Sequence, residues 1–504
     1  MRRSFSLHIS LILLFTALGM AVMGYHPAFE DGGIYLTAVK ANLNPALYPH
    51  DPHFFRLQMQ ATFFDKWVAD SVRWTGISVD CMMLLWQFAA IALIVFGCWS
   101  IARRLFPEER AQWAGVALVT AMFTLPVAGT ALYLVDQHLH PRALATGFIL
   151  LAVSRILSGK SWQAIPLLLL ALLMHPIMAV FGISFCFFLT VAMLESVPGW
   201  LRGWSRAEDR SLVLGFVPLG WVFEPPTPTW REVVERHTYF FLFRWEWYEW
   251  LGALAPLFLF WLLWRIARKR GENLLARFAL AILCYGVFQM TLAMVMLGVP
   301  SLVRLTPLQP MRFLHLIYFF LTLIAGCLAG KYLLKASVWR WAVFLLAING
   351  GIFASQEMIF ASSEHLELPG MTSSNPWEQA FAWIRQNTPT DAFFVLDPNY
   401  MAVSGEDYQS FRALAERSQL ADNIKDTAVV TLIPEIGPVW ARQVEAQGCN
   451  PGLLTCPGWS HIQLADFERL KAEFGVNWTL VSYPQPAGLD CRWHNDKLAV
   501  CRIP

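Results

Sequence analysis

The sequence predicts an α-helical polytopic membrane protein with about 11 transmembrane helices and a C-terminal extracytoplasmic domain of α/β or α+β type. Of the 504 residues, 56% are hydrophobic and only 15% are charged, whereas a soluble domain has about 25% charged residues. The mean hydropathy is +0.45, and the apolar residues form long runs that are typical of membrane spans. From about residue 361 these runs shorten. We therefore expect a transmembrane domain over residues 1–360 and a soluble domain over residues 361–504.

The first predicted element is an apolar run at residues 7–23, which follows Arg2 and Arg3. The run is long for a signal peptide and lacks a clean cleavage site, so we interpret it as an uncleaved span with a cytoplasmic N-terminus. An acidic first outer loop follows at residues 24–80, and Gly32 and Gly33 are expected to let its backbone turn. Within it, residues 55–74 have apolar side chains at helical spacing, which predicts one amphipathic helix in the membrane interface.

The remaining spans follow from the apolar runs and from the basic residues between them. They are expected at residues 81–102, 113–135, 143–157, 164–174, 176–194, 211–223, 251–266, 274–297, 313–329 and 341–360. We divide the run 164–194 at His175 because the proline that follows breaks helices. If that run were one kinked helix and 211–223 did not cross, the count would be about nine. Either count leaves the C-terminal domain outside.

The C-terminal domain alternates between helical and strand-like patterns. Helices are expected at residues 377–386, 411–417 and 464–474, and strands at 392–396, 428–432, 476–482 and 498–503. This alternation is typical of a layered α/β or α+β domain. Its basic residues Arg412, Arg417 and Lys425 are expected to be solvated. The domain has no glycine-rich phosphate loop, and the net charge of +2 gives no indication of a nucleic-acid partner.

Four cysteines lie in the C-terminal domain, and an even set in an extracytoplasmic domain predicts two disulfides. The sequence does not determine their connectivity, and free buried thiols are the alternative. The short local loops favour the pairs Cys449–Cys456 and Cys491–Cys501.

Polar residues from five separate segments are predicted to lie at the outer face of the bundle. They are Glu30, Asp31 and Asp51; His138, His140 and Arg142; His175; Arg244, Glu246 and Glu249; and Arg304, Gln309 and Arg312. A charged group costs up to about 2.5–3.5 kcal/mol at the centre of a membrane helix. Several such groups on one side therefore indicate a shared polar cavity.

An acidic residue directly after the first span, in a loop with an interfacial helix, resembles the GT-C superfamily of membrane glycosyltransferases. The matching residues are Glu30-Asp31, Tyr35 and the segment LYPHDPHF at 47–54. The His-Pro break at 175–176, the loop 309–312 and the C-terminal helix ending in WIRQNTPTDA are also similar to that superfamily. The resemblance implies a polyprenyl-phosphate sugar donor and a catalytic carboxylate in the first outer loop. The loop lacks a clean Asp-Glu pair, and the chain lacks the WWD motif of oligosaccharyltransferases, which argues against protein N-glycosylation.

Sugar transfer from a lipid phosphate needs a base for the acceptor hydroxyl and cations for the departing phosphate. Asp31 is the candidate base, with Glu30 as the second choice. Arg312 is the candidate phosphate clamp, since a guanidinium binds phosphate oxygens bidentately, and Arg142 is the second choice. Further candidate substrate-binding residues are Gln309, His138, His175, Asp51 and Tyr35.

Each of these residues also has a structural explanation. Asp31 could cap a helix, Asp51 could open a turn before Pro52, and Arg312 could reach the membrane interface with its aliphatic stem buried. The histidines could bind a metal or substrate, or could simply end helices. A divalent metal remains an open expectation, because His138 and His140 alone do not supply the three or four ligands that zinc needs.

The sequence favours a glycosyltransferase in a membrane such as the bacterial inner membrane, acting on a polyprenyl-phosphate sugar and a glycan, lipid or protein acceptor. Two alternatives stay open. One is a transporter or flippase for a lipid-linked glycan, although the chain has no convincing internal repeat. The other is a non-catalytic envelope protein whose C-terminal domain binds a partner.

Overall fold

The structure is a computed structural model that describes residues 2–194, 226–402, 409–453, 456, 458–459 and 462–504. Within these ranges, seven helical segments are long and apolar enough to cross a membrane. They are Ser6–Met23 in α1 (Arg2–Met23), α5 (Val79–Leu105), α9 (Pro176–Met193), α12 (Trp247–Lys269), α13 (Asn273–Gly298), Pro310–Leu334 around α14 (Leu314–Ala329), and α15 (Val338–Ile359). The span expected at 211–223 lies outside the described residues, and the expected count of about eleven is not confirmed.

The apolar run at 113–135 does not form the single span that we expected. It forms α6 (Glu109–Ala121) and then a small hairpin of β1 (Pro126–Val127) and β2 (Leu132–Tyr133). A 13-residue helix is about 20 Å long, whereas the hydrocarbon core of a bilayer is about 30 Å thick. Pro126 and Gly129, the latter at φ 62°, place turn-forming residues where the helix would have to continue.

The break expected at His175 is confirmed. It separates α8 (Ala164–Met174) from α9, and the His175 side chain caps α9 by accepting a hydrogen bond from the Met178 N–H at 3.3 Å. A short 3₁₀ turn, Ser161–Gln163, precedes α8. The 17-residue α7 (Pro141–Leu157) packs against α5, α8 and α9 at the centre of the bundle.

The segment 24–80, predicted to be the first outer loop and called the outer loop below, contains three helices, α2 (Asp31–Leu43), α3 (His53–Ala61) and α4 (Phe64–Thr75). The single amphipathic helix expected over 55–74 is therefore two helices. Gly32 and Gly33 do not form the expected turn but lie in the first turn of α2, where a Cβ would collide with His138 and with Ser410. The chain turns at Glu30 instead, with φ at 47°. The two glycines thus allow α2 to approach both the bundle and the C-terminal domain closely.

The C-terminal domain contains a five-stranded mixed sheet in the order β4-β3-β5-β7-β6. Its strands are β3 (Phe393–Leu396), β4 (Ser418–Gln419), β5 (Trp478–Ser482), β6 (Asp490–His494) and β7 (Leu498–Arg502). Strand β3 pairs in parallel with β4 and β5, and β7 pairs antiparallel with β5 and β6. Both predicted disulfides, Cys449–Cys456 and Cys491–Cys501, are confirmed.

Five α-helices accompany the sheet in the described part of this domain. They are α16 (Pro376–Asn387), α17 (Phe411–Ala415), α18 (Asp426–Leu432), α19 (Gly437–Ala446) and α20 (Leu464–Phe474). The strand expected at 428–432 is wrong, because these residues belong to α18. Their β-branched side chains pack against α3 and α11 (Pro228–Arg236) instead of joining the sheet.

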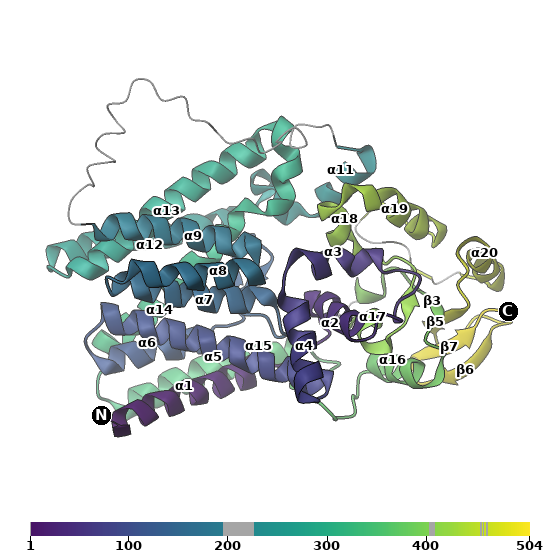
Figure 1. Cartoon of the computed structure of the whole chain (residues 1–504), viewed down its shortest axis with the longest axis horizontal. Coiled ribbons are helices and arrows are strands. Elements are labelled where there is room, and N and C mark those ends of the chain that lie inside the picture. Colours follow the sequence, from purple (N-terminus) through teal and green to yellow (C-terminus); the bar gives the residue numbers. More distant parts are fainter. Residues whose placement is uncertain (1, 195–225, 403–408, 454–455, 457, 460–461) are drawn as a thin grey trace.

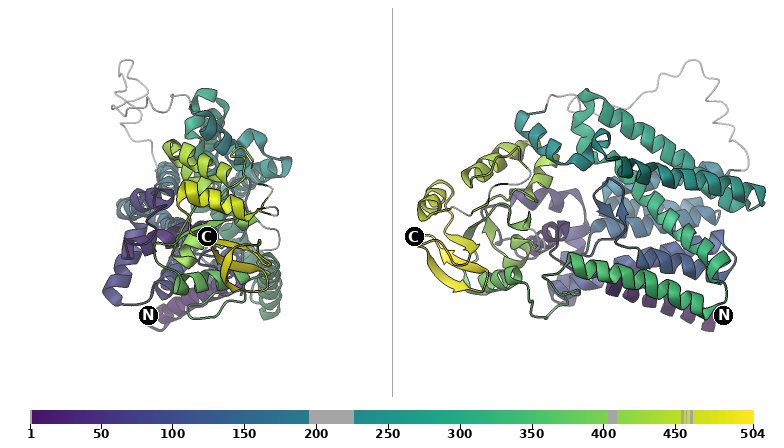
Figure 2. Two further views of the ribbon diagram at one scale, coloured as in Figure 1. Left: turned by 90° about the vertical axis from the view of Figure 1, so that its right-hand side faces the viewer. Right: turned by 180° about the vertical axis from the view of Figure 1, so that it is seen from behind.

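The helical bundle and the C-terminal domain lie at opposite ends of the molecule (Figure 1). The N-terminal end of α1 is at the far end of the bundle, and α2, α3 and α4 lie between the bundle and the domain in Figure 1 and in the right-hand view of Figure 2. Short 3₁₀ segments complete the bundle side of this junction, namely Thr238–Phe240, Leu242–Arg244, Pro300–Leu308 and Pro310–Phe313. The junction is therefore built from segments far apart in the sequence.

Candidate functional site

Two adjoining cavities lie at this junction. The first, which we call the polar cavity, has a volume of about 250 Å³, and the second, the apolar cavity, has a volume of about 360 Å³. Their common wall consists of Asp31, His237, Tyr239, Arg312, Ile424 and Lys425. The polar cavity is otherwise lined mainly by charged and polar side chains, whereas the apolar cavity adds Ile34, Ala61, Pro176, Ile177, Phe240, Pro307, Ala428 and Leu432.

Eight of the residues proposed from the sequence line these cavities. The polar cavity has Glu30, Asp31, His138, Arg142 and Arg312, and the apolar cavity has Asp31, Tyr35, His175, Gln309 and Arg312. Asp31 and Arg312 are thus on the common wall. They come from the start of α2 and from the 3₁₀ turn before α14, 281 positions apart in the chain.

Asp31 is held by groups from two other parts of the chain. Its Oδ1 lies 3.3 Å from the Nζ of Lys425, and its Oδ2 lies 3.8 Å from the Nε2 of His140. The Asp31 side chain is 39% exposed, so the carboxylate also faces the cavities. Burial opposes ionisation, but Lys425, His140 and Arg142 outweigh it and hold the pKa of Asp31 well below its usual range.

His140 presents an N–H toward Asp31. Its Nδ1 accepts the backbone N–H of Arg142 at 3.0 Å, and burial together with Arg142 lowers the pKa of the ring. The ring is therefore neutral near pH 7, and a neutral ring whose Nδ1 accepts must carry its proton on Nε2. This arrangement orients the Asp31 carboxylate without adding a full charge.

His138 lines the polar cavity with both ring nitrogens unpaired among the described residues. The side chain is 3% exposed, and burial lowers its pKa to about 4. Buried polar groups are nearly always hydrogen-bonded, so an imidazole with two free nitrogens at a cavity wall is suited to meet a bound molecule. Arg142, by contrast, is already engaged, because it donates to Oδ1 of Asp136 at 2.6 Å.

The cavity wall also carries strained backbone. Six non-glycine residues in the described part of the chain have positive φ, and three of them line these cavities: Glu30 at 47°, Ala131 at 52° and Gln309 at 50°. Such conformations cost of order 1–3 kcal/mol each and cluster at functional sites. Gln309 directly precedes the turn that carries Arg312, whose buried Nε has no partner among the described residues.

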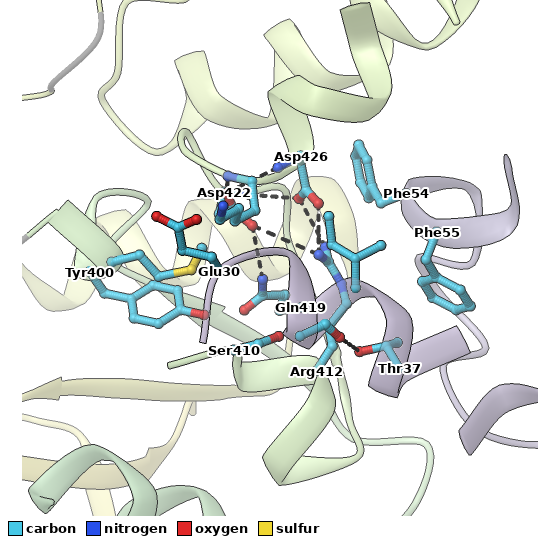
Figure 3. Close-up of a pocket in the computed structure, with 14 residues that line it drawn as sticks. Glu30, Thr37, Phe54, Phe55, Tyr400, Ser410, Arg412, Gln419, Asp422 and Asp426 are labelled. Atoms are coloured by element: carbon cyan, nitrogen blue, oxygen red, sulfur yellow. Dashed lines mark hydrogen bonds and ion pairs between the residues drawn. The ribbon is translucent and has the colours of Figure 1, made fainter. Parts of the chain in front are cut away.

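Asp51 does not line either cavity. It lies beside a small pocket with a volume of about 20 Å³, about the space for one water molecule. Its Oδ2 accepts the Nε–H of Arg412 at 2.5 Å and the backbone N–H of Gln419 at 3.1 Å. Figure 3 shows Arg412 reaching Asp426, which accepts two further hydrogen bonds at 2.7 and 3.0 Å. The surroundings of Asp51 are therefore those of a structural ion pair.

Sequence reasoning missed the contribution of the C-terminal domain and of the segment before α12. Lys425, Arg236, His237 and Tyr239 all line the polar cavity. The expectation that Arg412, Arg417 and Lys425 are solvated is wrong: Arg412 is 7% exposed, Arg417 is 3% exposed, and the Lys425 side chain is 21% exposed. No local pattern distinguishes these cations from surface residues, because their partners are known only from the folded structure. Two of these partners, Asp51 of Arg412 and Asp31 of Lys425, are hundreds of positions away in the chain.

The remaining outer-face residues serve local structure. Arg244 pairs with Glu235, and Glu246 and Glu249 form the capping box of α12. Among the described residues, no group of three or more His, Cys, Asp or Glu side chains is arranged to hold a metal ion. The residues present do not form a complete protein-only metal site, and we derive no step through a metal.

The seven apolar helices and the C-terminal sheet define an integral membrane protein with a cavity at the junction of its two parts. The family "Domain of unknown function (DUF6798)" matches residues 375–429, which include Arg412 and Lys425. Curated proteins give no match to the chain.

A solved structure similar to the chain is the archaeal oligosaccharyltransferase AglB from Archaeoglobus fulgidus, in complex with an inhibitory peptide and a dolichol-phosphate. The identity is 12%, the TM-score is 0.43, and the alignment covers 94% of this chain and 69% of that chain. This likeness is too distant to assign an activity.

Proposed function

We propose that the protein is a membrane glycosyltransferase that moves a sugar from a polyprenyl-phosphate donor to an acceptor hydroxyl on the extracytoplasmic side. The observation that carries this proposal is the common wall, where Asp31 and Arg312 face both a polar and an apolar cavity. A lipid-linked donor requires an apolar surface beside a phosphate site, and a hydrophilic acceptor requires a polar approach to the same point. The two cavities offer both.

In the proposed reaction Asp31 accepts the proton of the acceptor hydroxyl. The acceptor oxygen forms a bond to C1 of the sugar, and the bond from C1 to the phosphate oxygen breaks with its electron pair. Arg312 binds the phosphate oxygens on which negative charge develops. Polyprenyl phosphate leaves, and the atoms and charges balance. Glu30, next to Asp31 on the polar cavity, is the second candidate for the base.

The proposal is tested with the protein in lipid nanodiscs and a panel of polyprenyl-phosphate monosaccharides with labelled sugar. Membrane extract supplies the acceptor, and release of free polyprenyl phosphate is measured. We expect Asp31→Asn to lower transfer about 10²–10⁴-fold, the usual contribution of general base catalysis. Arg312→Ala should lower it about 10²–10³-fold, as expected for loss of a charge-stabilising donor.

Asp70→Asn is the matched control for Asp31→Asn, because Asp70 pairs with Arg73 on the surface of α4 and lines neither cavity. Full transfer activity in both Asp31→Asn and Arg312→Ala would refute the assignment. If the labelled lipid instead crosses the bilayer without sugar transfer, and the flux depends on Asp31, the flippase interpretation replaces this one.

A further inference from the structure

Lys425 occupies an unusual position at the junction. It precedes α18 in the C-terminal domain, yet its side chain reaches the common wall of the two cavities and ends 3.3 Å from Oδ1 of Asp31. It also lines the small pocket that contains Arg412 and Asp426. One residue therefore links the buried ion pairs of the domain to the carboxylate proposed as the base.

The backbone of Lys425 is held rigidly. Its N–H donates to Oδ1 of Asp422 at 2.5 Å, and the N–H of Asp426 donates to the same oxygen at 3.2 Å. Asp426 is in turn bound by Arg412 (Figure 3). Arg412 also binds Asp51 on the outer loop. Because the backbone of Lys425 is fixed, its amine can move only through rotation of the long side chain.

The contact between the amine and Asp31 is long by comparison with these hydrogen bonds. A distance of 3.3 Å exceeds the 2.7–2.9 Å that is usual for a charge-assisted hydrogen bond. Both side chains are partly exposed, at 21% and 39%, and exposed pairs contribute little because water and salt screen them. An anion in the cavity can therefore compete with Asp31 for Lys425.

The other cations on the cavity wall are less free to respond. Arg142 is bound to Asp136 at 2.6 Å. Arg236 donates to the backbone carbonyls of Asn423 at 2.8 Å and Pro451 at 3.0 Å. The buried Nε atoms of Arg142 and Arg312 both lack a partner among the described residues, but only Arg142 is held by a carboxylate. Arg312 is therefore the first site for an incoming phosphate. Lys425 is the neighbouring cation whose side chain has one hydrogen-bonding partner among the described residues, and that partner is Asp31.

We propose that Lys425 is an exchangeable cation that pairs with Asp31 in the empty site and moves to the phosphate of the bound lipid donor. The exchange would strip Asp31 of its nearest positive charge and so make it a stronger base only when the donor is present. Donor binding and the base strength of Asp31 are thereby coupled. This inference rests on the proposed function and deepens it. An acceptor that arrives alone would meet a carboxylate still paired with Lys425.

The test measures binding of polyprenyl monophosphate, the sugar-free product, to the full-length protein in nanodiscs. Wild type, Asp31→Asn, Lys425→Met and the double variant form a thermodynamic cycle. We expect Lys425→Met to weaken binding about 10-fold, as expected for loss of one charge-assisted contact. We expect Asp31→Asn to tighten binding, and to do so about threefold more when Lys425 is present, because only then is a competing contact removed.

Lys66→Met is the matched control, since Lys66 is an exposed lysine of α4 that lines neither cavity. Lys425→Arg, which keeps the charge, should retain most of the binding, and thermal unfolding verifies that each variant is folded. Unchanged binding in Lys425→Met overturns the exchange. If Asp31→Asn changes binding equally with and without Lys425→Met, the exchange is also overturned, and Lys425 is a fixed phosphate contact.

The two proposals can fail separately. If the four variants show the expected binding differences but no donor gives sugar transfer, the exchange of Lys425 is supported and the glycosyltransferase activity is refuted. If sugar transfer depends on Asp31 but the effects of Asp31→Asn and Lys425→Met on binding simply add, the glycosyltransferase activity is supported and the exchange of Lys425 is refuted. Absence of any binding of polyprenyl monophosphate to the wild type would refute both.

Discussion

Two carboxylates of the first outer loop each meet a cation of the C-terminal domain, and the two contacts are built differently. Asp31 lies 3.3 Å from Lys425, and the two side chains are 39% and 21% exposed. Asp51 lies 2.5 Å from Arg412, and these side chains are only 2% and 9% exposed. Arg412 also binds Asp426 through two hydrogen bonds, whereas Lys425 makes a single long contact.

The difference shows that residue types alone do not distinguish a structural ion pair from an ion pair whose members can take part in a reaction. The Asp51 pair is buried, and its arginine also binds Asp426, so removing the arginine leaves two buried carboxyl groups without their cation. The Asp31 pair faces a cavity and can exchange partners at little cost. The first fastens the outer loop to the domain, and the second leaves a reactive group available.

The largest expected effect comes from breaking the buried contact. Arg412→Met should lower the free energy of unfolding by about 3–5 kcal/mol, because Asp51 and Asp426 would remain buried without their cation. Lys425→Met is the matched comparison and should change it by less than about 1 kcal/mol. Denaturant titration in detergent micelles, followed by tryptophan fluorescence, measures both values. Equal destabilisation by the two variants would remove the distinction between the contacts.

A second prediction concerns the ion pair of Asp136 and Arg142, which has features of both contacts. It is short and buried, with side chains 9% and 5% exposed, yet both residues line the polar cavity. Asp136→Asn should lower the free energy of unfolding by about 2 kcal/mol. This is less than the loss expected if the whole contact were removed, because an amide oxygen can still accept a hydrogen bond from Arg142. The expected value lies between those of the other two pairs.

The pH dependence of stability identifies the Asp136 contribution. Burial opposes ionisation, but Arg142, His140 and His138 hold the pKa of Asp136 well below its usual range. In the unfolded chain its pKa is about 3.9. The stabilisation is thus present above pH ~4 and is lost as the pH falls toward the lower folded-state pKa. Asp136→Asn should therefore lose less stability than wild type between pH 6 and pH 3, and an unchanged profile would contradict this assignment.

The sequence was sufficient to predict apolar membrane helices, a C-terminal sheet domain and several of the residues that line the bundle side of the cavities. Apolar runs mark helices, and polar residues at their ends, such as Asp31 and Arg312, converge because the ends of spans meet at one face. The helix ends of the run 113–135 could not be predicted, because hydropathy does not register the turn at Pro126 and Gly129. The domain side was missed because Lys425 and Arg412 depend on tertiary contacts with Asp31 and Asp51.

A third carboxylate of the outer loop extends the comparison, because it forms no ion pair with any cation in the described part of the chain. Asp65 lies on α4, and its side chain is fully buried. No other described residue hydrogen-bonds either of its carboxylate oxygens. Burial therefore raises the pKa of Asp65 well above its usual range, and the folded protein holds it as a neutral acid.

The last and smallest predicted effect is a stabilisation by Asp65→Asn at neutral pH. The unfolded chain releases the Asp65 proton above pH ~4, whereas the folded chain keeps it until its raised pKa is reached, so stability falls as the pH rises between these values. The asparagine has no proton to lose and avoids this penalty. We expect a gain of about 1 kcal/mol or more at pH 8 and almost none at pH 4, measured by thermal unfolding in detergent at both values.

The same substitution at Asp51 should destabilise the protein at pH 8, because Arg412 would lose a charged partner. Opposite signs for one substitution at two buried carboxylates would show that the presence of a cation, and not burial itself, determines what each contributes.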